Sequence, residues 1–213
     1  MATATKWSNI AIAIQSAIAA AKTITALTKA SPGVATSVAH GYTTGDFVLL
    51  SVQGMSQVDQ MVARIIVLTL DTFSLEGINT TLFDTFTSGS AQKLTFGTTL
   101  TTAVSISASG GDYSFIDVTT IHDNVKKQIP GIANPATFSF ESIWDVSDAG
   151  LIALKEASDA AAQRAVRFTF ANGQKLVFTG YIGASMLPTG SAQDIVKTAA
   201  AITMFGKPNV YAS

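Results

Sequence analysis

The residues that most often carry out catalysis or bind metals are scarce in this chain. Its two histidines, His40 and His122, lie far apart, each in a segment of turn or loop character. A catalytic triad needs a nucleophile and a carboxylate beside the imidazole, and a zinc centre needs three or four ligands. The chain has 0 cysteines, so a thiol nucleophile, a disulfide or a Cys-based zinc site cannot form. We therefore interpret both histidines as ordinary loop residues.

Acidic side chains are the other candidates for acid–base chemistry. Glu141, Asp145, Asp148 and Glu156 lie in one stretch, and their spacing alone leaves a paired acid/base site open. A structural interpretation is simpler, because Asp148 would begin a helix and Glu156 would lie on its solvated face. Phosphate-binding loops, dinucleotide fingerprints, metalloprotease motifs and calcium loops are absent from the sequence. The sequence thus predicts neither an enzyme nor a cofactor.

The composition indicates a folded protein that is short of charge. Of 213 residues 47% are hydrophobic, but only 13% are charged, about half the usual share of roughly 25%. A chain with so few charges stays soluble through neutral polar side chains or by burying its exterior against partners. The 13 basic residues are scattered, whereas tight DNA binding needs a cluster of about six to ten. Apolar runs also fall short of the roughly 18 residues of a membrane span, so we expect no membrane insertion.

The polar and apolar pattern predicts a mainly β protein. Short alternating segments separated by Gly, Pro and Asp turns fill residues 23–75, which favours a small barrel or sandwich. Alternating segments return at residues 101–107, 113–118 and 137–144, and Phe138 and Phe140 share one face of the last. Residues 119–131 have no clear period and are predicted to be a long loop. Residues 165–171 and 175–182 flank Asn172-Gly173, a strong hairpin signal, and residues 194–205 form a closing strand before Gly206.

One segment has the pattern of an α-helix. In residues 148–163, Leu151, Leu154 and Ala161 recur at helical spacing, opposite charged side chains. Ser147 is a suitable N-cap, and the charge of Asp148 suits the positive end of the helix dipole. We expect an amphipathic helix that covers a sheet.

Several of these features together resemble the major tail tube proteins of long-tailed (siphophage-type) bacteriophages. The resemblance rests on a strand ending in Ile116-Asp117-Val118-Thr119, then a loop, an Ile129-Pro130-Gly131 turn and the strand at residues 137–144. The helix, the Asn172-Gly173 hairpin and Phe205-Gly206-Lys207-Pro208 follow in order. The resemblance covers residues 1–23 and 92–213, and its motifs are specific through their order rather than singly.

The resemblance implies a tail-tube β-sandwich or barrel with one flanking helix, formed by residues 1–24 and 92–213. It also implies hexameric rings stacked into a hollow tube that delivers the genome. Residues 25–91 look like an insertion whose His40-Gly41 and Gly45-Asp46 turn is similar to a small all-β barrel found in phage structural proteins and ubiquitin-activating enzymes. Because cysteine is absent, ubiquitin chemistry does not follow. We expect this module on the outer surface of the tube.

Physical reasoning leads to the same kind of assembly. Long sheet edges with few protecting charges aggregate unless they are meant to pair, and pairing around a ring closes them. Thr137, Ser139 and Glu141 are candidates for the face that lines the channel, because they alternate with Phe138 and Phe140; the alternative is that this face points to outside solvent. Candidates for contacts between subunits or rings are residues 1–8 and the loop residues Asp117, His122, Asp123, Lys126, Lys127 and Ile129.

The expected partners follow from this hypothesis. They are further copies of the chain, other tail proteins such as the tape measure, tail terminator and distal tail proteins, and phage DNA that passes through without specific binding. The protein would belong to the virion and be assembled in the bacterial host cytoplasm. A rival hypothesis is a β-rich binding module, such as a phage adhesin or a lectin-like domain that recognises a cell-surface ligand.

Overall fold

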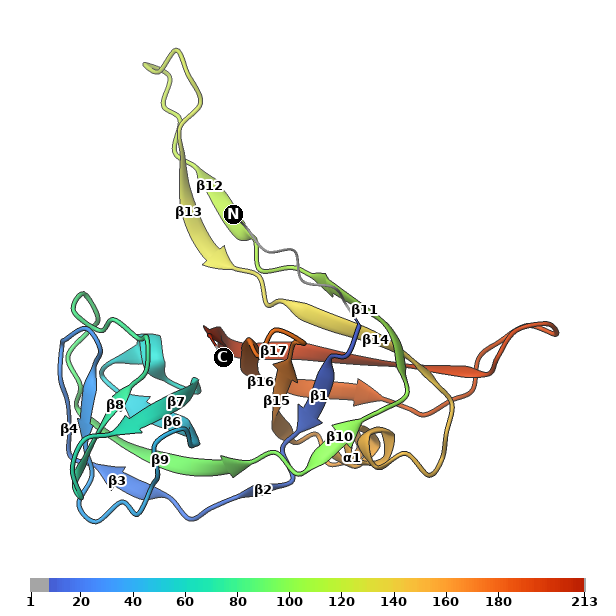
Figure 1. The fold of residues 1–213 in the computed structure, drawn as a ribbon. Coiled ribbons are helices and arrows are strands. Elements are labelled where there is room, and N and C mark those ends of the chain that lie inside the picture. The colour runs from blue at the N-terminus through green and yellow to red at the C-terminus, as the bar shows by residue number, and fades with distance from the viewer. Residues whose placement is uncertain (1–7, 213) are drawn as a thin grey trace.

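The structure is a computed structural model that describes residues 8–212 of the chain. The predicted fold class is confirmed, because these residues form many β-strands and one α-helix (Figure 1). In chain order the elements are β1 (Ala11–Ile14), β2 (Ala17–Ile18), β3 (Lys22–Ile24), β4 (Ala26–Leu27), β5 (Val34–Thr36), β6 (Phe47–Gln53), the 3₁₀ turn η1 (Ser56–Val58), β7 (Val62–Val67), β8 (Thr72–Leu75), β9 (Ser88–Thr95), β10 (Thr98–Leu100), β11 (Ala103–Ser109), β12 (Tyr113–Asp117), β13 (Gln128–Ala133), β14 (Thr137–Ile143), α1 (Ala149–Asp159), β15 (Gln163–Thr169), β16 (Lys175–Ala184) and β17 (Lys197–Tyr211).

One sheet has seven antiparallel strands in the order β10-β1-β15-β16-β17-β14-β11. Helix α1 packs against β16, β10 and β1 on one face of this sheet. We call the sheet and α1 together the body. Its core contains the predicted inward face of β14, since Phe140 is buried and Phe138 packs beside it. The rings of Phe138 and Phe178 stack with centroids 5.0 Å apart, and Phe168 lies 5.9 Å from Phe178.

The helix differs from its prediction at both ends. Its N-cap is Asp148 rather than Ser147, because the Asp148 carboxylate accepts the backbone N–H of Leu151 at 2.8 Å. The same carboxylate accepts the Thr101 hydroxyl at 2.6 Å, which ties the helix start to the chain between β10 and β11. The helix ends at Asp159 instead of residue 163, because Ala161 takes a left-handed φ of 47° and turns the chain into β15.

A second sheet has eight strands, β2 to β9. We call these strands and the turns between them the module. Its strands follow the order β2-β9-β6-β7-β8-β5-β4, with β3 also paired to β9. β3 pairs with β9, and β4 pairs with β5. Because only Thr25 separates β3 from β4, this one segment links β9 to β5, and the sheet curls until its ends meet. β4 and β5 pair as a hairpin around Ser31-Pro32-Gly33, one of the turns that separate the alternating segments of residues 23–75. The division into residues 25–91 and the remainder stays a prediction.

The closing strand is longer than predicted. It continues through Gly206 to Tyr211, and its second half pairs with Lys175–Val177 of β16. The pairing of β16 with β17 shifts register between Val177 and Thr179, which allows a bulge in β17. Gly206 takes the φ of 90° that this bulge requires. The pattern at Gly206-Lys207-Pro208 therefore marks a bulge within β17 instead of its end.

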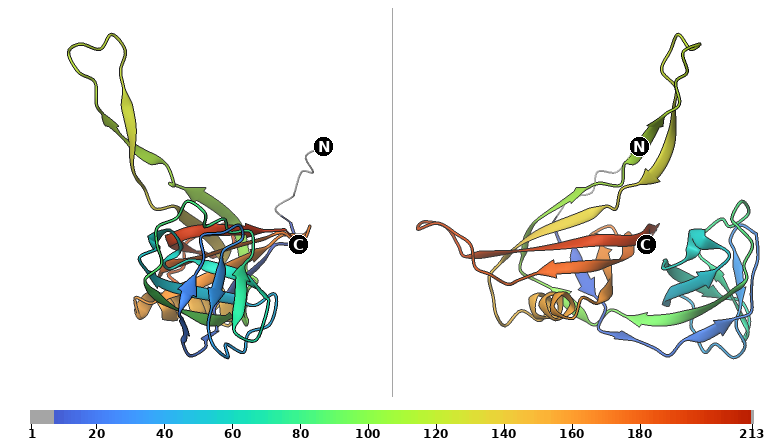
Figure 2. Two further views of the ribbon diagram at one scale, coloured as in Figure 1. Left: turned by 90° about the vertical axis from the view of Figure 1, so that its left-hand side faces the viewer. Right: turned by 180° about the vertical axis from the view of Figure 1, so that it is seen from behind.

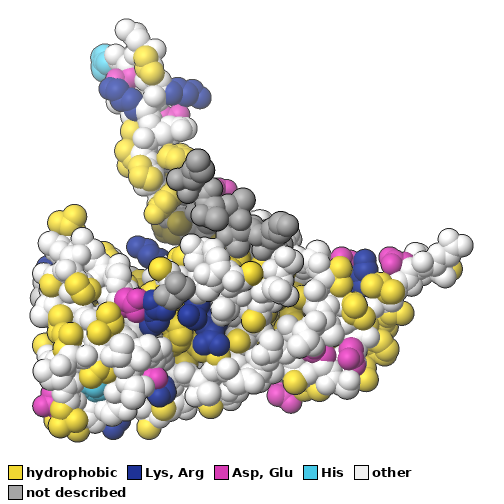
Figure 3. All heavy atoms as spheres, in the orientation of Figure 1, with side chains coloured by type: hydrophobic (Ala, Val, Ile, Leu, Met, Phe, Trp, Pro, Cys, Tyr) yellow, Lys and Arg dark blue, Asp and Glu magenta, His cyan; other side chains and the backbone are white. Residues whose placement is uncertain are grey.

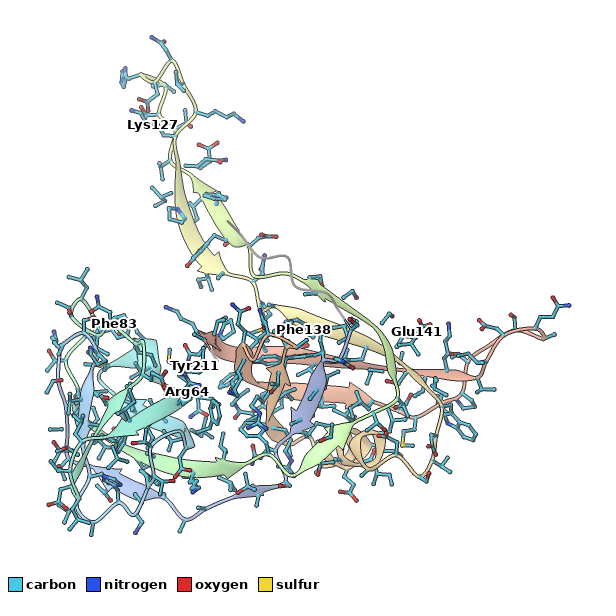
Figure 4. All side chains as sticks on the ribbon, viewed as in Figure 1. Arg64, Phe83, Lys127, Phe138, Glu141 and Tyr211 are labelled. Atoms are coloured by element: carbon cyan, nitrogen blue, oxygen red, sulfur yellow. The ribbon has the colours of Figure 1, made fainter. Side chains whose placement is uncertain are left out.

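The extended end of β17 joins the body to the module. The backbone N–H of Arg64 in β7 donates to the Tyr211 hydroxyl oxygen at 2.8 Å, and the guanidinium lies 4.9 Å from the Tyr211 ring centroid. The same guanidinium forms an ion pair with Glu76. Asn209 donates to the Val62 carbonyl at 2.6 Å. Figure 4 shows Arg64 and Tyr211 facing each other between the two parts.

Alkaline pH should weaken this joint. Burial raises the pKa of Tyr211 to about 12, and burial, followed by the nearby Asp46 charge, raises the pKa of Tyr42 in the module core to about 12. Folding thus favours the neutral phenols, so their contribution to stability is complete below the unfolded pKa of about 10. This contribution disappears as pH rises towards 12. We expect urea denaturation to show a falling free energy of unfolding above pH 10.

Tyr211→Phe is the variant that checks this expectation. At pH 7 it should lose about 1–3 kcal/mol, because the Arg64 N–H is left without its acceptor. Above pH 10 its stability should fall less steeply than that of the wild type, since the raised pKa of Tyr211 no longer contributes and that of Tyr42 remains. Equal slopes for the two proteins would show that Tyr211 ionisation does not oppose folding.

Candidate assembly and channel surfaces

Around β14, small side chains line the face of the body sheet that turns away from the core, and Tyr181 and Phe205 lie farther along the same face. The candidates Thr137, Ser139 and Glu141 of β14 lie on this face, since they alternate with Phe138 and Phe140. Across the sheet Ser139 is paired with Ser107 of β11 on one side and Ala201 of β17 on the other. Equivalent pairings place further small residues beside Thr137 and Glu141, namely Ser105, Ser109, Ala199 and Thr203.

The charge on this face is nearly balanced. The Glu141 carboxylate lies 3.6 Å from the Lys197 ammonium and accepts the Ser105 hydroxyl at 3.4 Å. Lys197 is also 3.8 Å from Asp194, so the local charge sums to one negative unit. A surface of hydroxyls and methyls with a slight acidic excess gives a phosphate backbone little to bind. Alternation in the sequence could group only the β14 residues Thr137, Ser139 and Glu141, because their neighbours on β11 and β17 depend on strand register.

A long hairpin, which we call the arm, projects from the body (Figures 1 and 2). It consists of β12 and β13, which continue β11 and β14 beyond the sheet. The predicted loop at residues 119–131 is wrong for its last four residues, because Gln128 pairs with Asp117 and Ile129 with Ile116. Long-range pairing therefore overrides the weak local pattern of this segment, and residues 118–127 remain as the tip.

The tip holds most of the candidate contact residues in an ordered turn. Asp117 accepts the Thr119 N–H at 2.8 Å, and the hydrogen bonds from Thr119 lower the pKa of Asp117. Asp123 pairs with Lys127 and accepts both the N–H and the hydroxyl of Thr120 at 3.0 Å. These partners, Lys127 first, lower the pKa of Asp123.

The remaining candidates are all exposed. His122 and Lys126 lie at the tip and Ile129 on the shaft of the arm. Figure 4 shows Lys127 at the same end of the arm, far from Glu141 on the sheet. The structure therefore gathers the loop candidates on one projection and keeps them apart from the channel-face candidates.

The shaft of the arm exposes apolar side chains on both faces. Ile116 and Ile129 lie opposite each other on one face, and Phe115 and Pro130 on the other. Phe115 is 63% exposed and Ile132 86%. A two-stranded ribbon is at best marginally stable alone in water, so these faces call for a covering partner. The sequence pattern did not single out Phe115 and Ile116, because an alternating strand gives no sign that both its faces are unpacked.

Two glycines set the direction of the arm. Gly110 and Gly111 have φ values of 83° and 85°, which only glycine adopts without strain. A Cβ on Gly110 would lie 2.4 Å from the Pro135 carbonyl oxygen. The chain therefore bends at a fixed point between the sheet and the arm.

Metal-ligand clusters and membrane-spanning helices are both absent from the described residues. Nowhere in residues 8–212 do three His, Asp or Glu side chains gather as metal ligands would. His40 is buried in the module, where its Nδ1 accepts the Tyr42 N–H at 3.0 Å and its ring stacks on Tyr42. In the same part of the chain no helix is long and apolar enough to cross a membrane.

Among residues 8–212, β10 and β11 are edge strands of the body sheet, and the arm is unpacked. These are features of a structural subunit that functions in an assembly. Comparison with known families agrees. A family model described as phage tail tube protein, TTP, matches residues 53–213, more than half of the chain. The chain therefore belongs to the phage tail tube protein family, as the resemblance implied. The match begins at residue 53, inside the segment predicted to be an insertion.

Family membership has several direct consequences. The protein is a structural component of a phage virion, and the family suggests a non-enzymatic role, self-association and contact with other tail proteins. A comparison with curated proteins finds no match.

Proposed function

We propose that this protein assembles into hexameric rings that stack into a hollow tube, and that the phage genome passes through this tube into the host. The family match carries the proposal. Physical support comes from the two edge strands of the body sheet, β10 and β11, which can pair with neighbouring copies and close a ring.

In this proposal the face around Thr137, Ser139 and Glu141 lines the channel. DNA must slide along the wall, so small neutral groups and a slight acidic excess suit it better than Lys or Arg. The arm, with Asp117, His122, Asp123, Lys126, Lys127 and Ile129, makes contacts between subunits or rings, and its apolar shaft supports this assignment. The same role proposed for residues 1–8 falls, apart from Ser8, outside the described residues.

The module lies on the outer surface of the tube. The tube ends contact the tape measure, tail terminator and distal tail proteins, and assembly takes place in the cytoplasm of the bacterial host.

Electron microscopy of the purified protein over a range of concentrations tests the proposal. We expect rings or tubes with an open channel and sixfold symmetry in end views. Compact particles whose size does not change with concentration would instead favour a binding module of the adhesin or lectin type.

Ser139→Cys tests which face lines the channel, since the chain has 0 native cysteines. In assembled tubes we expect this thiol to react with a small maleimide but not with a polymer-linked maleimide too large to enter. A thiol placed at Leu82, 94% exposed on the module, should react with both. Equal reaction of the Ser139→Cys tube with the large reagent would place this face on the outside.

A further inference from the structure

A hollow lies beneath the arm, where the arm meets the second half of β17. Its volume is about 510 Å³, and its lining includes Tyr113, Pro135, Met204, Phe205, Lys207 and Pro208. This size is within the range of about 300–1,000 Å³ that is usual for binding pockets. Lys207 is the one charged residue of the lining, and it forms no ion pair within residues 8–212. The hollow is therefore an apolar site with a single cation at its rim.

A second feature projects from the opposite end of the molecule. Residues 185–196 join β16 to β17, and we call them the distal tip. The distal tip is ordered, because Thr189 and Lys197 exchange two backbone hydrogen bonds of 2.8 Å. Trp144 holds the base of the distal tip in place. The backbone N–H of Trp144 donates to the Val196 carbonyl at 3.0 Å, and its indole N–H donates to the Met186 carbonyl at 2.9 Å.

The distal tip exposes apolar side chains around one acid. Leu187 is 66% exposed and Ile195 51%, although the tip itself is held in place. Asp194 is the single charged residue of the segment. Figure 3 shows hydrophobic side chains gathered near the base of this projection and, separately, on the arm. The distal tip therefore has the apolar character that complements the hollow. Its Asp194 carboxylate, which lies 3.8 Å from the Lys197 ammonium within one copy, has the charge opposite to that of Lys207.

The two features cannot meet within one copy. Lys197 at the start of β17 adjoins the tip, and Gly206 near its end lines the hollow. At about 3.3 Å per residue, the strand keeps them roughly 30 Å apart. A contact between different patches at opposite ends of a subunit is heterologous, and such contacts build rings or filaments.

We propose that the distal tip of one copy seats in the hollow of the next copy, with Leu187 and Ile195 among its apolar lining and Asp194 beside Lys207. This inference rests on the proposed function, because it names the contact by which the chain self-associates. Apolar anchors seated in a pocket usually supply most of the binding energy of an interface, and a charge pair at the rim sets the partner and register.

Charge exchange tests the pairing. We expect Asp194→Lys and Lys207→Glu each to raise the protein concentration needed for half-assembly by about tenfold or more, as the loss of a close interfacial charge pair does. The double variant should return to within about threefold of the wild type, because the pair is restored in reverse. Glu156→Lys, an exposed reversal on α1, is the matched control and should assemble normally. A double variant as defective as either single one would overturn the pairing.

Cross-linking provides a second, independent test in the cysteine-free chain. The variant with Asp194→Cys and Lys207→Cys, treated with a short bis-maleimide under assembly conditions, should give a ladder of covalent multimers. A mixture of the two single variants should stop at dimers, as a heterologous contact requires. Tubes without a ladder would overturn this inference alone, whereas a wild type that never assembles would remove the proposed function as well. A Lys207→Glu defect seen only with other tail proteins present would assign the hollow to one of them.

Discussion

Phe178→Ala should lower the free energy of unfolding by about 3–5 kcal/mol, the usual range for deleting a buried phenylalanine ring. Phe178 is fully buried on the central strand β16, and its ring contacts those of Phe138 and Phe168, which also contact each other. The surrounding strands are held by antiparallel ladders on both sides, so they cannot close the resulting cavity. Urea denaturation, at protein concentrations below those that support assembly, measures the loss.

Phe205→Ala is the matched control for this prediction. Phe205 lies on the opposite face of the same sheet and is 46% exposed, so its removal should cost less than about 1 kcal/mol. Similar losses for the two variants would mean that the stacked rings do not form the main core of the body.

Deletion of residues 123–127 should abolish tube formation while leaving the fold of the monomer intact. The deleted residues include Lys127, which pairs with Asp123 within the tip, and Val125, which is 75% exposed. The body core contains no residue of the arm, so the thermal midpoint of the monomer should stay nearly unchanged. Tubes should be absent at concentrations at least about thirtyfold above those at which the wild type assembles, as expected when an interface loses a dominant contact.

A pair of point variants separates a contact role from general solubility. Ile121→Asp at the arm tip should weaken assembly, whereas Leu82→Asp on the module should not, although the two side chains are 97% and 94% exposed. Sedimentation before and after concentration measures the assembled fraction. Normal tubes from the deletion variant would show that the arm tip takes no part in assembly.

Local patterns predicted the features of the fold that depend on neighbouring residues. The alternation at residues 137–144 correctly placed Phe138 and Phe140 towards the core, and Asn172-Gly173 correctly marked a hairpin. The errors arose where distant residues decide the structure. Residues 128–131 are a strand because β12 lies beside them, and β17 passes Gly206 because β16 continues alongside. The helix ends early because Ala161 adopts a left-handed backbone conformation, which an alanine in the sequence does not indicate.

The candidate surfaces were predictable only in part, for a similar reason. Thr137, Ser139 and Glu141 could be grouped because they alternate within one strand. Their cross-strand neighbours on β11 and β17 could not be predicted, since a shift of one residue in register would replace all of them. The hollow beneath the arm and the exposed faces of the arm depend on the bend at Gly110, which the sequence marks only as a turn.

The continuity of β11 with β12 and of β13 with β14 has a mechanical consequence. A pull on the end of the projecting hairpin draws β11 and β14 in the same direction, so the hydrogen bonds between β14 and β17 carry the load in shear and share it. Tension applied outside the sheet therefore passes through the bend at Gly110 and Gly111 and reaches the row of small side chains around Ser139.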